Sequence, residues 1–572
     1  MWKNRIMKKI NIKIILASLL TTYFILFTSI SFSQQENVPI DHDVYIFLKE
    51  MKVKRIIDNI HDDNPSMSRE EVRKFLETID SKSGELSSTE KGLLKKYQNE
   101  FYDNKADSSN TYQMFGSHSG FSSKTSDLFS DKIKYIYAFR NNDANFYLNL
   151  LGRFVHGQNV SPEINNSELF DIGFRFRGTF FDKLGYSLSF IKGGIKGSGS
   201  FAAVIDPRMN YNFKYVENRE NIGNYDFTEG YLRYFTRPAK DMSLAIELGR
   251  EKMKFGYGYK SKFILSGDHP LLDFIKLDFD YGVFSFTSWH ASTVGEYDPI
   301  RDLNYTKYIA TNQFKLSFKN LFDFAIGESI IYSGRGIELA YLNPFAFYKF
   351  EEMSLQDRDN AMAWFQLETH FIKDLEFQAT FYMDDDPFGN LQNLSNYINK
   401  TGYKLSAFWY SPFSVNDLSL IFEYTRIRPF VYSHINPKDT YTAWGQILGD
   451  QIGPNSDEIF ARLAYNVNAS LRLNFDFQHI RHGNNIYDSL GNLIFNAGGN
   501  VFVAHRDGID PVNIEFLDGE RINSNIFTFG MRYEPIRQVF LDLVFKKIVQ
   551  KNATLDISDN SSYGYLKLQF EL

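Results

Sequence analysis

Residues 470–478, which read SLRLNFDFQ, alternate strictly between apolar and polar side chains. Successive side chains of a β-strand point to opposite faces, so the leucines and phenylalanines would share one face and the polar residues the other. The same alternation recurs at residues 172–177 and 418–425. These runs approach the roughly 9 to 11 residues that a tilted strand needs to cross a bilayer, whereas strands of soluble sandwiches usually have about 5 or 6. The pattern predicts an outer-membrane β-barrel.

Several of these runs are joined by tight turns. Residues 314–318 are followed by 319–321 and then by the apolar-alternating run 322–326, and residues 174–177 would pair with 186–190 in the same way. Short turns alternate with long loops, as in barrels with periplasmic turns and extracellular loops. At roughly 10 residues per strand plus connections, the chain accommodates about 16 to 18 strands. We therefore expect an all-β fold, a large antiparallel transmembrane barrel.

The composition fits this class of protein. The 55 Phe and 35 Tyr residues suit a lipid-facing band and its interfacial girdles. Mean hydropathy is nonetheless negative, −0.33, because half of every strand faces water. The chain has no cysteine, which rules out disulfides, thiolate metal sites and a cysteine nucleophile.

The N-terminus predicts a secretory signal peptide over residues 1–33. Five basic residues precede an apolar run at 14–30, and small residues at 31–33 flank a plausible cleavage site. Translation would start at Met1 or Met7, and a retained anchor helix is the alternative interpretation. Cleavage removes five positive charges and no acid, so the net charge falls from −6 to about −11, which argues against nucleic acid as a partner.

Between residues 34 and 110 the apolar period changes from two to 3.6. Asp41 is a candidate N-cap for a first helix, and Ser68 with Glu71 and Ser87 with Glu90 form capping boxes for two more. We expect a small periplasmic helical module (34–110) docked on the rim of the barrel (111–572). Its charged faces would either be solvated or recruit a periplasmic partner.

Four long segments interrupt the strand pattern. Residues 249–278 and 328–368 do not alternate throughout, and they are predicted to fold into the lumen or to form the exterior surface. Residues 429–456 and 484–521 are long enough to cap the outer mouth.

A set of short segments follows in a fixed order along the chain: residues 39–57, 68–79 and 86–101 as helices, then Gly249-Arg250, Phe255-Gly256-Tyr257-Gly258, Leu265-Ser266, Tyr341-Leu342-Asn343-Pro344, Asp359-Asn360 and His479-Ile480-Arg481-His482-Gly483. With these segments the chain resembles the Wzi-type capsule-assembly outer-membrane proteins, in the form found in Bacteroidetes-like bacteria. The resemblance implies a barrel of about 18 strands that helps attach or assemble surface polysaccharide and acts as a lectin rather than an enzyme.

Sugar rings stack on aromatic side chains, while amides and guanidinium groups bind hydroxyls and acidic groups. Arg335 would either contact an anionic glycan or pair with Glu338 or Glu351, and each aromatic residue could instead belong to an interfacial girdle. The candidate polysaccharide-binding residues are Tyr257, Tyr259, Trp289, Arg335, Tyr341, Asn343, Asn360 and Trp364.

Other function classes have weaker support. His290, His479 or His482 could form a triad with Ser266 or Ser288, but no ordered hydrolase signature accompanies them. The acidic run at 384–386 lacks the glycine and distal glutamate of a calcium loop. We therefore predict no catalytic site, cofactor or metal, and surface polysaccharide and outer-membrane lipid as partners. A porin or substrate-specific channel is the main alternative.

Overall fold

The computed structural model describes residues 34–58, 60–102, 111–115, 124–141, 143–217, 223–384 and 392–572. The predicted signal peptide and Asp385 and Asp386 lie outside these residues. Within them, no helix is long and apolar enough to cross a membrane.

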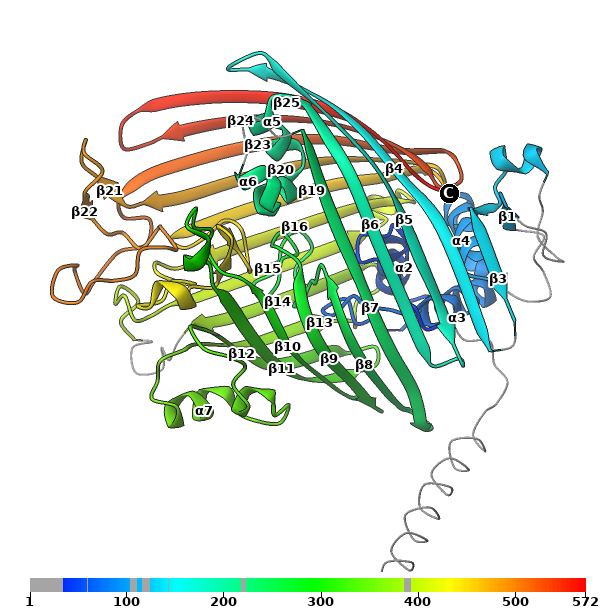
Figure 1. The fold of residues 1–572 in the computed structure, drawn as a ribbon, viewed down its shortest axis with the longest axis horizontal. Coiled ribbons are helices and arrows are strands. Elements are labelled where there is room, and N and C mark those ends of the chain that lie inside the picture. Colours follow the sequence, from blue (N-terminus) through cyan, green and yellow to red (C-terminus); the bar gives the residue numbers. More distant parts are fainter. Residues whose placement is uncertain are drawn as a thin grey trace, which may run out of the picture.

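The described residues form a closed antiparallel barrel of 18 strands, which confirms the predicted fold class (Figure 1). Its strands are β4 (Ala144–Ser161), β5 (Asn165–Phe180), β6 (Leu184–Gly197), β7 (Asn224–Ala239), β8 (Met242–Glu251), β9 (Leu272–Tyr281), β10 (Phe284–Val294), β11 (Thr306–Phe318), β12 (Phe322–Ser333), β13 (Asn360–Thr369), β14 (Leu375–Asp384), β15 (Thr401–Tyr410), β16 (Leu418–Ile427), β19 (Ser456–Asn468), β20 (Leu471–Asn484), β23 (Glu520–Ile536), β24 (Val539–Asn552) and β25 (Ile557–Glu571).

The barrel closes where β25 pairs with β4, with Phe570 opposite Gly152. The shorter elements are β1 (Thr111–Gln113), β2 (Ile133–Tyr135), β3 (Tyr137–Arg140), η1 (Ser83–Glu85), η3 (Thr125–Phe129), α5 (Gly199–Ile205), η4 (Pro207–Tyr211), α6 (Phe213–Glu217), η5 (Arg301–Leu303), η6 (Ala340–Leu342), α7 (Tyr348–Ser354), η8 (Pro412–Ser414), η9 (Pro437–Asp439), β17 (Thr442–Ala443), β18 (Gln446–Ile447), β21 (Ile486–Tyr487) and β22 (Leu493–Phe495).

The strands alternate as the sequence predicts. In β20, Phe475 is exposed on the outer face, whereas Arg472 points inward and forms an ion pair with Glu50 at 2.8 Å. The predicted hairpins are also present, because Phe318 pairs with Phe322 across the turn from β11 to β12. Outward apolar rows and inward polar rows therefore run around the wall, as lipid outside and protein inside require.

The two ends of the barrel differ. Short turns lie at one end together with the N-terminal helices: Lys319, in the turn from β11 to β12, pairs with Asp58 at 3.0 Å, and Asp374 donates its backbone N–H to Val53 at 2.9 Å. The long connections lie at the other end. By the usual asymmetry of bacterial barrels, the helices mark the periplasmic end and the long loops the extracellular end.

Three helices form the N-terminal module: α2 (Val44–Val53), α3 (Arg69–Ser81) and α4 (Ser88–Phe101). Both predicted capping boxes, at Ser68 and at Ser87, are present. The prediction that Asp41 caps the first helix is wrong. Residue 43 occupies the N-cap of α2 without a side-chain hydrogen bond, and Asp41 instead pairs with Lys254 at 2.9 Å.

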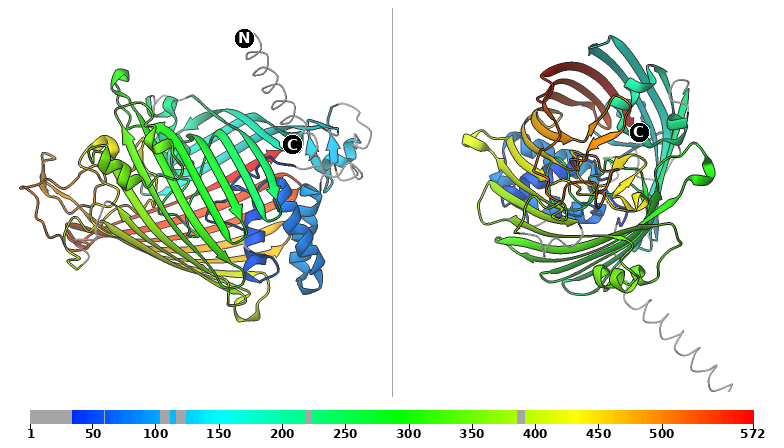
Figure 2. Two further views of the ribbon diagram at one scale, coloured as in Figure 1. Left: turned by 90° about the horizontal axis from the view of Figure 1, so that it is seen from below. Right: turned by 90° about the vertical axis from the view of Figure 1, so that its left-hand side faces the viewer.

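The module does more than dock on the rim. Phe47, Leu48 and Met51 of α2 belong to the same buried apolar cluster as the inward residues Phe408 and Phe460 of the barrel wall. The right-hand view of Figure 2 places the blue helices within the outline of the barrel. Helix α2 therefore plugs the periplasmic mouth from inside.

Buried charges fix this plug. Lys52 of α2 contacts Glu368 of β13 at 2.5 Å, and Lys49 contacts Glu368 at 2.9 Å and also Glu376 of β14. Burial disfavours the charged form of Lys52, but Asp62, Glu368 and Glu376 outweigh burial and raise its pKa well above the usual value. The lysines therefore stay charged and hold α2 against the wall.

The middle of the lumen is filled by residues 252–271, which connect β8 to β9. Phe255, Phe263 and Leu265 are fully buried in an apolar cluster with inward wall residues such as Trp289 and Trp364. The first predicted interruption thus folds into the lumen. The second, residues 334–359, instead lies outside the wall beside β12, where α7 is visible in Figures 1 and 2.

We predict that Glu368→Ala loosens the module. The substitution leaves Lys49 and Lys52 buried with fewer partners, and breaking a buried ion pair typically costs about 3–5 kcal/mol. Trypsin should then cleave the module of the purified protein in detergent faster than in the wild type. Glu77→Ala, on the exposed face of α3, is the matched control and should change nothing. Equal cleavage of the two variants would contradict the role of the buried pair.

Candidate functional site

A polar cavity of about 430 Å³ opens at the extracellular mouth, between the loop 428–455 and the loop 485–519. Two long segments that were expected to cap the mouth therefore meet here. The lining combines four apolar residues, Ile447, Ile452, Pro454 and Val501, with a polar set in which amides predominate: Gln451, His482, Asn484, Asn485, Tyr487, Asn500 and Glu520.

Asn485 lines this cavity and has one side-chain donor that is buried and unpaired in the part of the chain that the structure describes. The residue is 3% exposed, and its Oδ1 accepts a hydrogen bond from the backbone N–H of Gly499 at 3.2 Å. Its Nδ2 has no hydrogen-bond partner among the described residues. A buried amide donor without a partner costs free energy, but this Nδ2 is itself shielded from solvent, so it would reach a ligand oxygen only after the side chain rotates.

Three aromatic rings form a second feature of the mouth, which we call the aromatic group: Phe213 of α6, Tyr297 and Trp444. The rings of Tyr297 and Trp444 stack at 5.9 Å with 7° between their planes, and Phe213 meets Trp444 edge-on at 6.3 Å. Phe213 is 41% exposed. Three different loops thus bring a partly exposed aromatic surface together at the extracellular end.

One hairpin connects the cavity with the aromatic group. Strands β17 and β18 pair around a turn that carries Trp444, and Ile447 at the end of β18 lines the cavity. Glu296 holds this hairpin, because its carboxylate accepts hydrogen bonds from the Thr442 hydroxyl at 2.6 Å and from the backbone N–H of Gly445. Both features are therefore positioned by the same short element.

The lumen below the mouth is closed by packing between protein segments. Tyr432 and Tyr441 donate hydrogen bonds from their hydroxyls to the backbone carbonyls of Phe263 and Ile264, at 3.0 and 2.9 Å. Gly256 donates its backbone N–H to the Asp63 carbonyl at 2.8 Å. The extracellular loop, the lumen segment and the periplasmic module thus form one continuous column.

The residues predicted from sequence do not gather at this mouth. Tyr257, Trp289 and Trp364 lie in the lumen, each at most 1% exposed. Asn360 is 2% exposed and donates to the Asp439 carbonyl at 3.1 Å, and Tyr259 donates its hydroxyl to Glu376 at 2.7 Å. A polysaccharide would reach them only after rearrangement of the column, so their role in binding stays a prediction.

The other three candidates lie on the segment outside the wall. Arg335 forms a two-pronged ion pair with Asp359, at 2.8 and 2.5 Å, and also contacts Glu338 at 3.5 Å. Tyr341 is 1% exposed and donates its hydroxyl to the same Asp359 at 2.7 Å, whereas Asn343 is exposed. Arg335 thus has one of the internal partners considered for it, Glu338, and its main partner is an aspartate that sequence reasoning did not consider.

Sequence reasoning missed Asn485, Tyr297 and Trp444. Each lies in a loop, and loops have no periodic pattern that would show whether a side chain contacts a ligand or only solvent. A weak signal was available for Trp444, since it lies in a segment that the sequence places at the outer mouth and an indole ring can stack on a sugar.

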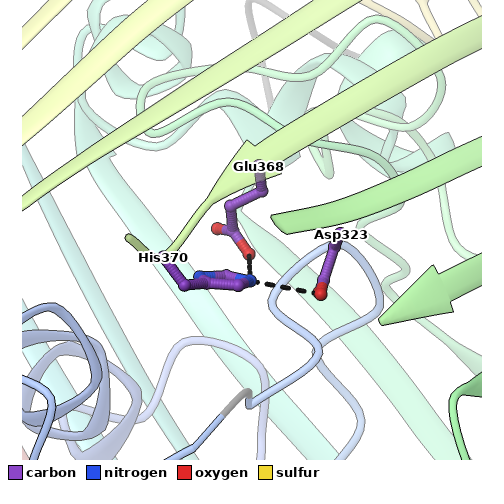
Figure 3. Close-up of side chains that lie close together, drawn as sticks. All are labelled: Asp323, Glu368 and His370. Carbon is purple, nitrogen blue, oxygen red and sulfur yellow. Dashed lines mark ion pairs between the residues drawn. The ribbon is translucent and has the colours of Figure 1, made fainter. Parts of the chain in front are cut away.

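The histidines considered for a triad have other partners. His290 faces out of the wall and bonds Tyr332 at 2.9 Å, and His482 bonds Ser456 at 2.5 Å. At the periplasmic end, His370 points toward Asp323 at 3.1 Å and Glu368 at 3.8 Å (Figure 3). Because Lys49 and Lys52 already supply Glu368 with positive charge, we assign this cluster to docking of the module and not to a metal.

A closed 18-strand barrel with lipid-facing apolar rows and its own segments packed in the lumen defines a large outer-membrane β-barrel. Residues 192–492 match the family described as capsule assembly protein Wzi. This match covers more than half of the chain, so the protein belongs to the Wzi capsule-assembly family and is located in the outer membrane.

Among solved structures, the chain is similar to Wzi of Escherichia coli, with 12% identity over 93% of this chain and 99% of that one and a TM-score of 0.53. That protein is described as an outer-membrane, carbohydrate-binding β-barrel involved in group 1 capsule assembly. OprD of Pseudomonas aeruginosa matches at 9% identity, 75% and 93% coverage and a TM-score of 0.42, and OccAB4 of Acinetobacter baumannii at 8%, 75% and 98%, and 0.43. No curated protein sequence matches this chain.

We predict that Glu296→Ala frees the β17–β18 hairpin. The chain has no native cysteine, so a spin label on Gln446→Cys reports on this hairpin alone. Loss of the two hydrogen bonds to Glu296 should increase the label's mobility in its electron paramagnetic resonance spectrum. Glu217→Ala, which removes an exposed partner of Arg301 nearby, is the control and should leave the spectrum unchanged. Superimposable spectra for both variants would show that Glu296 does not position the hairpin.

Proposed function

We propose that this protein binds surface polysaccharide at its extracellular mouth and thereby helps attach or assemble the capsule, without catalysing a reaction. The observation that carries the proposal is the pairing of a cavity lined by the amide residues Gln451, Asn484, Asn485 and Asn500 with the aromatic group around Trp444. Family membership supports it, since the E. coli relative binds carbohydrate.

The two features suit different parts of a sugar. The apolar face of a pyranose ring packs on an aromatic ring, while its hydroxyls need donors and acceptors at fixed positions. The amides of Asn484, Asn485 and Asn500 supply both kinds of group. Because one hairpin joins the cavity to the aromatic group, consecutive sugar residues of one chain are expected to occupy both.

A porin or substrate-specific channel is the alternative, and the filled lumen argues against it. The apolar cluster around Phe263, Trp289 and Trp364 fills part of the middle of the barrel. A conducting barrel needs a continuous polar path, which such a cluster narrows.

The helical module is proposed to remain in the periplasm after cleavage of residues 1–33. Its charged outer face, which includes Lys74 and Glu77 of α3, is available to a periplasmic partner. A pull-down from periplasmic extract with wild-type protein and a Lys74→Glu, Glu77→Lys variant would test that partner separately from glycan binding.

Conductance distinguishes the lectin from the channel. The purified barrel in a planar bilayer should give negligible single-channel current, and addition of the organism's own polysaccharide should leave the current unchanged. Large, steady openings in the absence of polysaccharide would favour a channel and would overturn the plugged lectin.

We predict that Trp444→Ala weakens binding of the native polysaccharide roughly tenfold, because loss of one stacking ring removes about 1 kcal/mol or somewhat more. Surface plasmon resonance on the immobilised barrel measures this change. Trp409→Ala is the matched control, since Trp409 packs on Phe413 at the periplasmic end. Equal affinities for the wild type and both variants would exclude the aromatic group as the site.

A further inference from the structure

Residues 334–359 connect β12 to β13 but do not stay above the extracellular rim. The segment, which contains η6 and α7, folds back along the outside of the barrel and packs on β10 to β13. Figure 1 shows α7 beyond the edge of the sheet, and the right-hand view of Figure 2 shows it outside the ring of strands.

The wall beneath this segment is unusually polar. Ser288, His290, Asn312 and Glu328 all belong to the outward rows, since their neighbours along each strand face the lumen. Elsewhere the outward rows are apolar and exposed, as at Phe422 on β16. Amides and carboxylates that face hydrocarbon without partners are costly.

The segment supplies those partners. Asn312 donates its Nδ2 to the Ala346 carbonyl at 3.1 Å and accepts a hydrogen bond from the Tyr348 hydroxyl at 3.1 Å. Glu328 accepts a hydrogen bond from the backbone N–H of Tyr348 at 2.9 Å. Asn312 itself is only 2% exposed. The segment therefore shields the polar patch of the wall from whatever surrounds the barrel.

The outer surface of the segment carries large apolar side chains, unlike the surface of a loop that faces water. Its tyrosines Tyr341 and Tyr348 are buried against the wall at 1% exposure, whereas its larger apolar side chains point away from the protein. The exposed ones are Ile337 at 54%, Leu339 at 76%, Leu342 at 41%, Phe345 at 68%, Phe347 at 63%, Phe350 at 77% and Met353 at 58%.

This apolar surface is continuous with the lipid-facing surface of the barrel. The Phe345 ring stacks on Phe286 of β10 at 5.3 Å with 13° between the planes. Phe286 lies in the outward row that runs through Phe314, Ile326 and Phe365. Since that row crosses the barrel within its membrane-spanning strands, Phe345 lies at the depth of the hydrocarbon.

We propose that residues 334–359 insert into the membrane, where Phe347 at the N-cap of α7 and Phe350 and Met353 within α7 contact the acyl chains of outer-membrane lipid. The segment acts as a lipid-facing cover that replaces part of the wall. Tyr341 and Tyr348 are turned to the strands and the large apolar side chains to lipid, whereas the charged residues Asp357 and Arg358 at the end of the segment are exposed and would lie at the membrane surface. Continuity with the lipid-facing row favours acyl chains over a second copy of the chain as the occupant.

Spin-label accessibility in liposomes tests this placement. Because the chain has no cysteine, Phe350→Cys carries a single label. Two reference sites bracket the result: Ile326→Cys on the lipid-facing row of β12, and Leu490→Cys on the extracellular connection between β21 and β22, which is 85% exposed. Collision rates with molecular oxygen report lipid, and those with a water-soluble nickel chelate report the aqueous phase.

The label at position 350 should behave like the one at 326, with at least a several-fold excess of oxygen over nickel collisions. Behaviour like position 490 would overturn the proposal. A label that neither reagent reaches and that shows dipolar broadening from a second label would also overturn the proposal. That result would assign the surface to contact with a second copy of the chain. Phe347→Cys repeats the measurement if the first variant does not fold, and it interrogates the same face of α7.

Discussion

The structure depends on one constraint, that backbone groups inside lipid must find their hydrogen-bond partners within the protein. The pairing of β25 with β4 meets it by joining the last strand to the first long one, so the wall has no open edge. Closure around 18 strands leaves a lumen too wide for wall side chains alone to fill. The N-terminal module, the segment 252–271 and the extracellular loop 428–455 occupy that space, and buried charges such as Lys52 secure them.

Much of the fold follows from the sequence because strand alternation is a short-range signal. The inward and outward rows of β20, the hairpin between β11 and β12 and the capping boxes at Ser68 and Ser87 each depend on residues within about a dozen positions of one another. The direction in which long loops turn depends on contacts between segments hundreds of residues apart. The sequence therefore marks residues 249–278 and 328–368 as interruptions of the strand pattern but does not show that the first enters the lumen and the second covers the outer wall.

The candidate site also depends on contacts between distant segments, which the sequence does not reveal. Most of the predicted aromatic and amide candidates lie where the strand pattern is interrupted. Of the candidates, Trp289 and Trp364 form the core of the lumen, and Tyr341 is buried against the outer wall. The mouth instead uses Trp444, Tyr297 and Asn485. These residues come from separate loops, and only the folded chain brings them together. Asp41 illustrates the point on a smaller scale, since its lysine partners lie more than 200 positions away.

The column of packed segments in the lumen also connects the two ends of the barrel mechanically. From the β17–β18 hairpin, Leu448 accepts a hydrogen bond from Ser266 at 2.9 Å, the lumen segment reaches Asp63 through Gly256, and the module is tied to the wall at Glu368. A pull on the outer mouth is therefore shared along the whole height of the barrel and reaches the turns on the opposite side of the membrane. Displacing the mouth would therefore require contacts to break along the lumen and not only at the loops.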